Sequence, residues 1–231
     1  MRLNKAIAIL GICSRRTADE FVSKGMVKVN NAKVEELGTK VNAGDIISVN
    51  GINYTVKNKT DPSVWLYNKP TGLITSHKDD RGRDTVFDAV RDLIGERVIS
   101  VGRLDINSEG LLLLTNSGEF AHVAEKSDWT RHYRVRVFGH IPETFAENVK
   151  RGITIDGIHY APVEISVQSY AGKHHWCLCI LREGKNREIR KIFNNFGLQV
   201  SRLIRIKYGP YELGDIPLGG VKKVKPILEF C

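Results

Sequence analysis

The chain has 231 residues, of which 42% are hydrophobic and 26% are charged. This composition is typical of a soluble globular protein, and no apolar run approaches the roughly 20 residues that a membrane-spanning helix requires. The 35 lysines and arginines outnumber the 26 aspartates and glutamates. This excess predicts a polyanionic partner, with nucleic acid as the first candidate and an anionic membrane surface as the alternative.

The first predicted element is an amphipathic helix over residues 2–10. Leu3, Ile7 and Leu10 recur at helical spacing and therefore share one face. The same patch imitates a secretory signal peptide, but it is short, lacks a small-residue cleavage site and continues into the basic sequence SRR. We therefore predict a helix of the folded protein rather than a leader.

A second helix is predicted to begin after Ser14, which can cap it, and to end at Gly25. Short strands follow at residues 27–30 and 45–51. Residues 1–58 should therefore form a small α/β module.

This module is basic, since residues 1–60 contain ten lysines and arginines but five aspartates and glutamates. An ordinary solvated helix face is the alternative explanation, but the local charge density favours RNA binding. The predicted RNA-contacting residues are Arg2, Lys5, Ser14, Arg15, Arg16, Lys24 and Lys28.

The stretch RLNKAIAILGICSRRTADEFVSKGMVKVNNAKV contains the patterns R-L-x-K, S-R-R and G-x-V-x-V-N in that order. It resembles the family of RNA-binding modules named after ribosomal small-subunit protein four. The resemblance covers about residues 2–51 and implies that the module contacts RNA.

The polar stretch NKTDPS predicts a linker, which we place at residues 59–63. Residues 64–231 then carry strand patterns at VWLYNKP, RVISVGRLD, GLLLLTN, HYRVRVFG, APVEISVQSY and HHWCLCILRE. Helical patterns lie at residues 84–95, 115–126, 142–152 and 186–197. Because strands and helices do not alternate strictly, we predict an α+β domain with a mixed, largely antiparallel sheet and helices packed on it.

The four cysteines predict neither a disulfide framework nor a metal site. They form no C-x-x-C pair, which is consistent with a reducing, cytoplasmic location. His174, His175, Cys177 and Cys179 lie close together, but HWCLCI alternates like a strand. The two cysteines should therefore pack on one face of that strand, and we expect no metal here.

The stretch VGRLDINSEGLLLLTNSGEF holds the most informative candidate residue, Asp105. Leu111 to Leu114 predict a strand that is buried on both faces. A carboxylate held beside such a strand costs several kcal/mol unless it is compensated. Asp105 is therefore either a turn residue that bonds its own backbone or a carboxylate held at the floor of a site.

Three segments in chain order carry a second resemblance: GRLDINSEGLLLLTNSGE with Asp105, RHYRVRV with Tyr133, and LREGKNREIRKIF with Arg190. Together with YNKPTGLITS, they are similar to the RsuA/RluB-type family of pseudouridine synthases that modify ribosomal RNA. The stretch NREIRKIFNNFGLQVSRLIRIKYGP is most similar to members that act on the large subunit.

This resemblance implies that a uridine in RNA is detached at its glycosidic nitrogen, turned, and rejoined to the same sugar through carbon five. No cofactor is required. Asp105 would be the catalytic carboxylate, either by attacking the substrate covalently or by removing a sugar proton. Tyr133 would stack on the flipped base. Arg190 would pair with Asp105 and keep its carboxylate ionised.

The same resemblance implies that Arg103 contacts RNA beside the flipped base and that Leu181 and Ile189 wall the pocket. Residues 181–208 hold eight lysines and arginines against two glutamates, which predicts further phosphate contacts. These candidates are Lys185, Arg187, Lys191, Arg202 and Arg205.

We expect a monomer whose partner is ribosomal RNA, and large-subunit RNA in particular. The alternative is a catalytically inactive RNA-binding protein of ribosome assembly. Membrane-surface binding is disfavoured because no amphipathic helix with exposed bulky apolar residues is predicted.

Overall fold

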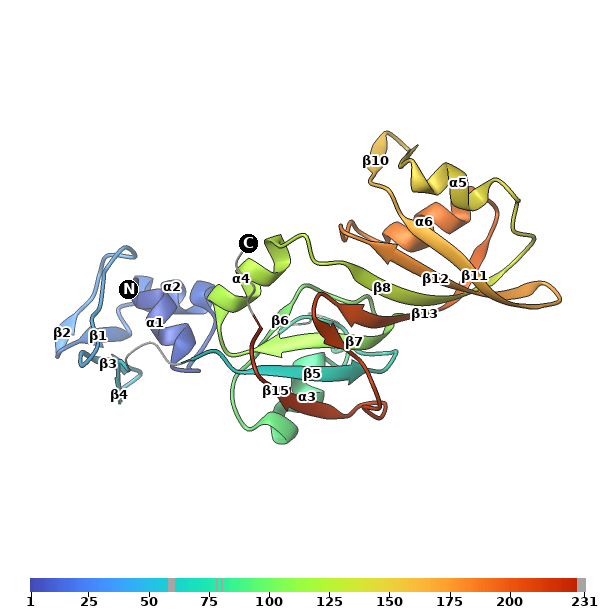
Figure 1. Cartoon of the computed structure of the whole chain (residues 1–231). Coiled ribbons are helices and arrows are strands. Elements are labelled where there is room, and N and C mark those ends of the chain that lie inside the picture. Colours follow the sequence, from blue (N-terminus) through green and yellow to red (C-terminus); the bar gives the residue numbers. More distant parts are fainter. Residues whose placement is uncertain (58–60, 78, 80, 228–231) are drawn as a thin grey trace. The chain divides into compact units, whose positions relative to one another are not determined.

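The computed structural model describes residues 1–57, 61–77, 79 and 81–227. The chain divides into two compact units, Met1–Pro62 and Ser63–Cys231, each with its own hydrophobic core (Figure 1). Of the predicted linker, residues 59 and 60 lie outside the described residues. Ser63 already belongs to the larger unit, because its backbone bonds to the side chains of Asn116 and Thr115.

The smaller unit combines two helices with a four-stranded antiparallel sheet of order β2-β1-β3-β4. Leu3 and Ile7 of the first helix pack with Ala18 and Val22 of the second. This arrangement confirms the predicted α/β module. Its elements are α1 (Leu3–Ile9), α2 (Arg15–Ser23), β1 (Val27–Val29), β2 (Ala32–Lys33), β3 (Ile46–Val49) and β4 (Ile52–Thr55).

Both ends of α2 follow the sequence signals. The Ser14 hydroxyl oxygen accepts a hydrogen bond from the backbone N–H of Thr17 at 3.1 Å, as an N-cap does. Gly25 follows the helix with a φ of +67°, a conformation that a residue without Cβ adopts at little cost. The predicted cap and stop are therefore confirmed.

The larger unit is built on one nine-stranded sheet and a separate hairpin. The main path of the sheet is β11-β12-β8-β13-β7-β5-β15, with β6 paired to β7 and β14 to β13. The elements are β5 (Val64–Lys69), α3 (Val86–Ile94), β6 (Ile99–Val101), β7 (Glu109–Thr115), α4 (Gly118–Lys126), β8 (Arg131–Phe138), α5 (Phe145–Lys150), β9 (Ile153–Ile155), β10 (Ile158–Tyr160), β11 (Glu164–Ala171), β12 (His174–Leu181), α6 (Glu188–Asn195), β13 (Gln199–Tyr208), β14 (Tyr211–Glu212) and β15 (Val221–Val224).

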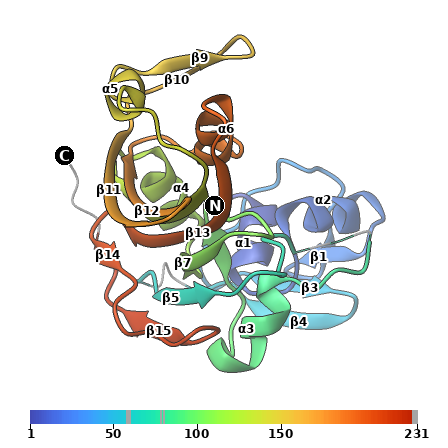
Figure 2. The same cartoon turned by 90° about the vertical axis from the view of Figure 1, so that its right-hand side faces the viewer.

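Strand β7 explains how the sheet separates two hydrophobic layers. Leu112 and Leu114 point into the layer that also holds the apolar residues of α3, α5 and α6. Leu111 and Leu113 point into the layer covered by α4. The four-leucine run is thus buried on both faces, as predicted. The strands curl strongly on the side of the sheet where α5 and α6 pack (Figure 2).

Among the described residues, every strand pair is antiparallel except β13 with β7, so the sheet is mixed and the predicted α+β class is confirmed. The predicted strands omitted β13, although it lies between β8 and β7 at the centre of the sheet. Three lysines and arginines within its ten residues hid the alternation. The short strands β9, β10, β14 and β15 were also omitted.

The cysteines of β12 lie as the strand alternation predicts. Cys177 and Cys179 are both fully buried on one face, within the layer that α5 and α6 cover. Burial raises the pKa of the Cys177 thiol to about 11. These thiols therefore act as core packing groups.

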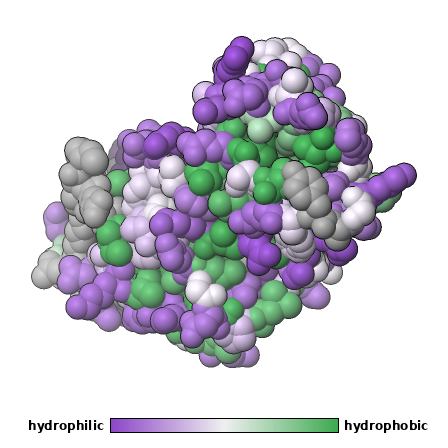
Figure 3. Space-filling model, turned by 45° about the vertical axis from the view of Figure 1, so that its right-hand side comes forward, coloured by the Kyte–Doolittle hydropathy of each residue, from purple (hydrophilic) through white to green (hydrophobic). Residues whose placement is uncertain are grey.

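No helix among the described residues is long and apolar enough to cross a membrane. On the face drawn in Figure 3, hydrophilic residues in purple surround and separate the hydrophobic residues in green.

Candidate active site

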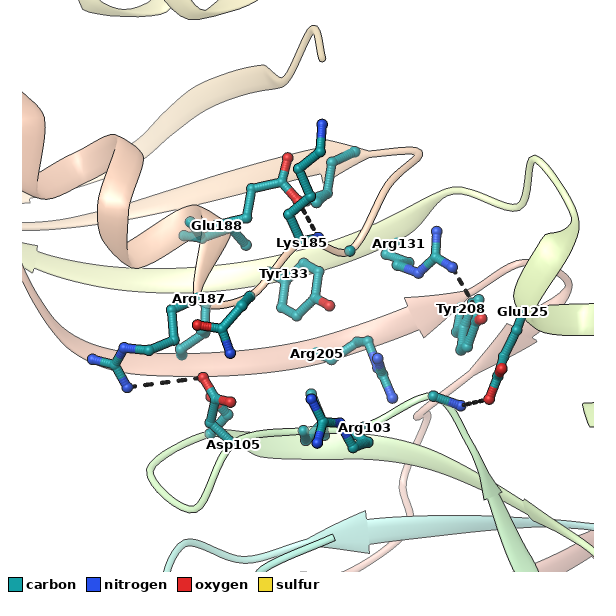
Figure 4. A pocket seen from close by; sticks show the side chains of 18 residues that line it. Arg103, Asp105, Glu125, Arg131, Tyr133, Lys185, Arg187, Glu188, Arg205 and Tyr208 are labelled. Atoms are coloured by element: carbon teal, nitrogen blue, oxygen red, sulfur yellow. Dashed lines mark hydrogen bonds and ion pairs between the residues drawn. The ribbon is translucent and has the colours of Figure 1, made fainter. Parts of the chain in front are cut away.

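A pocket of about 560 Å³ opens on the larger unit, between two loops and above the central strands. One wall is the loop after β6, which carries Arg103 and Asp105. The opposite wall is the loop after β12, which carries Lys185 and Arg187 (Figure 4). Tyr133 of β8 lies between these walls. The pocket thus brings together residues from Gly102 to Tyr208, which are 106 positions apart in sequence.

Asp105 lies at the edge of the pocket rather than in its depth. Its side chain is 37% exposed, and its carbonyl oxygen accepts the backbone N–H of Ser108 in a turn. Neither sequence alternative describes this state fully, because the bond in the turn is made by the main-chain carbonyl of Asp105 and its carboxylate lies at the edge of the pocket rather than at its floor. The desolvation cost that the sequence suggests is much reduced by this exposure.

The cation at Asp105 is Arg187, with 3.9 Å between Arg187 Nη1 and Asp105 Oδ2. Arg187 precedes α6 and has a φ of +52°, which costs a non-glycine residue roughly 1 kcal/mol. This backbone conformation leads into the helix while the side chain lies beside Asp105 in Figure 4. The geometry holds a guanidinium near the carboxylate at some conformational cost.

The predicted pairing of Arg190 with Asp105 is corrected by the structure. Arg190 Nη2 donates to the carbonyl oxygen of Asn107 at 2.8 Å, and Nη1 donates to that of Val200 at 3.0 Å. Arg190 lies in the first turn of α6, three positions after Arg187, and its guanidinium binds backbone carbonyl oxygens. It thereby ties the Asp105 loop to the start of β13.

Tyr133 is 8% exposed, and its ring faces the pocket from β8. Its cross-strand neighbours are Cys179 of β12 and Arg205 of β13. Leu181, at the end of β12, and Ile189 of α6 are buried and line the same pocket. Arg103 is exposed at its rim.

Two of the predicted RNA-contacting arginines already have partners within the protein. Arg205 is 2% exposed, and its Nε donates to the carbonyl oxygen of Leu111 at 2.7 Å. Arg202 forms a bidentate pair with Glu109, both bonds measuring 2.8 Å. Residues 199–208 form a central strand, so these side chains meet groups of neighbouring strands. The Arg202 side chain is still 50% exposed and Arg205 lines the pocket, so their contact with RNA stays a prediction.

The remaining predicted cations of this region lie closer to solvent. Lys185 and Arg187 are exposed at the pocket. Lys191 is half-buried and lines an adjoining cleft of about 260 Å³, which it shares with Arg187 and Arg190. Arg187 borders both hollows.

Lys69 was missed by the sequence analysis. It is fully buried, and its ammonium donates to the carbonyl oxygens of Pro70, Asp105 and Ser108 at 3.0, 3.2 and 3.0 Å. Burial lowers the pKa of Lys69 to about 8, against the opposing charges of Asp105 and Glu109. A lysine at the end of the apolar strand VWLYNK was the available signal.

Arg131 and Tyr208 also line the pocket without having been predicted. Arg131 is 9% exposed, and its guanidinium donates to the Tyr208 hydroxyl at 3.1 Å and to the carbonyl oxygen of Arg182 at 2.7 Å. The Tyr208 ring lies beneath both Arg131 and Arg205, 4.6 and 5.0 Å from their guanidinium carbons. This cluster closes the end of the pocket away from Asp105 in Figure 4.

In the smaller unit, the predicted RNA-contacting cations are exposed, except for the half-buried Lys5. Among the residues that the structure describes, none of these cations forms an ion pair. Ser14 is half-buried, and its hydroxyl is used in the cap of α2 and in a 2.8 Å contact with Thr17. Its contact with RNA stays a prediction.

Comparison with known proteins agrees with this geometry. The family model described as RNA pseudouridylate synthase matches residues 63–195, which contain Asp105, Tyr133 and Arg190. The chain belongs to the RNA pseudouridine synthase family. The S4 domain model matches residues 1–47, so this synthase carries an RNA-binding S4 domain in its smaller unit.

Relatives extend over both units of the synthase. An uncharacterized RNA pseudouridine synthase of Rickettsia prowazekii is 45% identical over 226 residues, covering 96% of this chain and 94% of that protein. The ribosomal large subunit pseudouridine synthase B of Xylella fastidiosa is 38% identical over 216 residues, covering 90% of this chain but 45% of that protein. A crystal structure of a pseudouridylate synthase superimposes with a TM-score of 0.67 at 23% identity, covering 97% of this chain and 96% of that one, and supports the fold alone.

Proposed function

We propose that this synthase converts one uridine of large-subunit ribosomal RNA to pseudouridine and that the carboxylate of Asp105 is its catalytic group. The observation that carries this proposal is the shared pocket, in which Asp105 and Tyr133 face a space large enough for a nucleotide. The large-subunit target is supported by the 38% identity with the Xylella fastidiosa enzyme. This chain covers 45% of that protein, so identity alone does not transfer the RNA target, and the large-subunit target is proposed here.

The reaction is an isomerisation whose atoms balance without a cofactor. The bond between uracil N1 and ribose C1′ breaks, the base turns, and a bond forms between C5 and C1′. The proton on C5 is then lost and N1 gains one. Asp105 acts either by adding to C1′ as the base leaves or by removing a proton from C2′. Both routes require an ionised carboxylate beside the sugar.

Other pocket residues have roles that follow from their positions. Flipping the uridine costs a few kcal/mol, and stacking on the Tyr133 ring returns about 1–3 kcal/mol. Arg187 keeps the Asp105 carboxylate oriented from 3.9 Å. Arg190 holds the Asp105 loop through the carbonyl oxygen of Asn107. Arg103 contacts the RNA beside the flipped base.

Binding of the RNA involves both units. Exposed cations of the smaller unit contact phosphates, as do Lys185, Arg187 and Lys191 of the larger unit. These contacts position the strand, whereas the pocket selects the uridine.

The test is a pseudouridine map of ribosomal RNA from cells with and without this synthase. We expect one large-subunit position to be lost in cells lacking the protein and restored by the wild type. Asp105→Asn should not restore it, and its rate on the same RNA in vitro should fall by at least about 10²–10⁴-fold. RNA affinity and unfolding free energy should change little, since Asp105 is partly exposed. A lost small-subunit position would refute the target, and full activity of the variant would refute the role of Asp105.

A further inference from the structure

Glu188 is a buried carboxyl group that the proposed chemistry does not use. It lies in the first turn of α6 and is 3% exposed. Its Oε2 accepts the backbone N–H of Lys185 at 2.9 Å. Its Oε1 is buried, and no described donor bonds to it. An ionised carboxylate in this position would leave a lone pair unsatisfied, so a proton on this group is the simpler state.

Glu183, in the loop before α6, is the partner of this carboxyl group. Its Oε1 accepts the backbone N–H of Ala161 at 2.7 Å, and its Oε2 accepts from Lys185 Nζ at 2.7 Å. Burial, together with the hydrogen bond to Glu183, raises the pKa of Glu188 to about 8. Two carboxyl groups can hydrogen-bond to each other only when one proton lies between them.

Glu183 and Glu188 lie at the two ends of a short segment, residues 183–188, that forms one wall of the pocket. Glu188 holds the backbone of Lys185 from one side, and Glu183 holds its ammonium from the other. Lys185 Nζ also donates to the carbonyl oxygen of His159 in β10 at 2.6 Å. Arg187, which faces Asp105, lies inside this segment (Figure 4).

We propose that Glu188 is a positioning residue: by sharing one proton with Glu183, it holds the Lys185–Arg187 wall of the pocket in the arrangement that receives RNA. This inference rests on the proposed function of the pocket. When the shared proton is lost, two carboxylates repel each other within the segment. The wall then loosens, and both Lys185 and Arg187 lose their fixed positions.

The charged groups around the pair determine the direction of the pH effect. Lys185 faces both carboxyl groups and favours their ionised forms, whereas burial of Glu188 opposes ionisation more strongly. From β10, His159 faces the pair with its carbonyl oxygen, and the Tyr160 ring lies 5.7 Å from Lys185 Nζ. The pair should therefore keep its proton at neutral pH and release it near pH 8. Lys69 titrates in the same range, so variants are needed to separate the two groups.

The first experiment requires no substrate. In the full chain labelled with ¹³C at glutamate carboxyl carbons, the Glu188 signal should titrate above pH 7 and be absent from Glu188→Gln. Glu164→Gln, at an exposed position of β11, serves as the matched control and should leave that titration unchanged. A Glu188 carboxyl that is already ionised at pH 7 would overturn the inference.

The second experiment separates KM from kcat on an unmodified large-subunit RNA transcript. For the wild type, KM should rise about tenfold between pH 7 and 9, because about a tenth of the pair keeps its proton one pH unit above a pKa of about 8. Glu188→Ala should raise KM at every pH. Glu188→Gln should rescue it and abolish the pH dependence, because its amide can donate to Glu183 and accept from Lys185 without titrating.

Either of two results would overturn the inference. The first is a KM for Glu188→Gln that still rises with pH, which would assign the titration to Lys69. The second is a KM for Glu188→Gln at pH 7 that is as high as the KM for Glu188→Ala. If the wild type forms no pseudouridine in this RNA, the proposed target fails. The carboxyl titration then still decides the state of the acid pair by itself.

Discussion

The cations of the two units differ in what they contact, although the sequence presents them alike. In the smaller unit, Arg15 and Arg16 are exposed and have no carboxylate partner among the described residues. In the larger unit, Lys69 and Arg205 are buried against backbone carbonyl oxygens, and Arg202 is paired with Glu109. Positive charge in a sequence therefore does not by itself predict RNA contact, because some of the cations are already bound to groups of the protein. The following substitutions should separate the two kinds of cation.

The largest effect on stability is expected for Lys69→Met. The substitution removes the ammonium that donates to the carbonyl oxygens of Pro70, Asp105 and Ser108, of which that of Asp105 keeps the backbone N–H of Ser108. It should lower the free energy of unfolding by about 3 kcal/mol, which urea denaturation at pH 7 measures. The rate of isomerisation should fall as well, because the Asp105 loop loses its anchor. Lys173→Met, at an exposed turn, is the control and should change neither quantity.

The pH dependence of the unfolding free energy of the wild type and of Lys69→Met gives a second test. The pKa of Lys69 is lowered to about 8 in the folded protein, so between pH 8 and its ordinary value the unfolded chain binds more protons. The wild type should therefore gain unfolding free energy relative to Lys69→Met as the pH rises through this range. A difference that stays constant from pH 8 to 10 would contradict burial of a charged ammonium.

A smaller effect is expected for Arg202→Ala. Glu109 would lose its bidentate partner while its own side chain stays 12% exposed, so we expect a loss of about 1 kcal/mol in unfolding free energy. In a double-mutant cycle, the variant Arg202→Ala/Glu109→Gln should be less destabilised than the sum of the two single variants. RNA affinity should barely change. A large loss of affinity without a loss of stability would show that Arg202 contacts RNA.

The smallest effect on stability is expected for the double variant Arg15→Ala/Arg16→Ala, within about 0.5 kcal/mol. Its RNA affinity should fall, and the slope of log affinity against log salt should decrease by about 0.7 for each lost phosphate contact. Lys33→Ala is the comparison variant, because Lys33 already pairs with Glu35 at 3.2 Å. Equal salt slopes for the double variant and the wild type would exclude these arginines from the RNA interface.

Much of the fold could be predicted because local patterns agree with it. Ser14 and Gly25 mark the two ends of a helix because of their capping chemistry. The four leucines of β7 indicate a strand between two layers. Strand β13 could not be predicted in the same way. The Nε of its inward arginine, Arg205, donates to the carbonyl oxygen of Leu111, 94 positions away in the chain, and no local pattern reports such a partner.

The candidate site shows the same limit. The sequence motifs supplied Asp105, Tyr133 and the neighbourhood of Arg190. They did not distinguish Arg187 from Arg190 as the cation near Asp105, because both lie in one turn and the choice depends on where α6 begins. Lys69 and Glu188 could not be found from motifs because their partners are backbone groups or a second acid, and a sequence motif does not encode such partners.

The place of β13 in the sheet also has a consequence for synthesis of the chain. This strand spans residues 199–208 yet separates β8 from β7, so the central sheet cannot close until residue 208 has left the ribosome. The smaller unit makes its contacts within the first 62 residues and can fold long before that point. The growing enzyme therefore acquires its means of holding RNA well before its means of changing it.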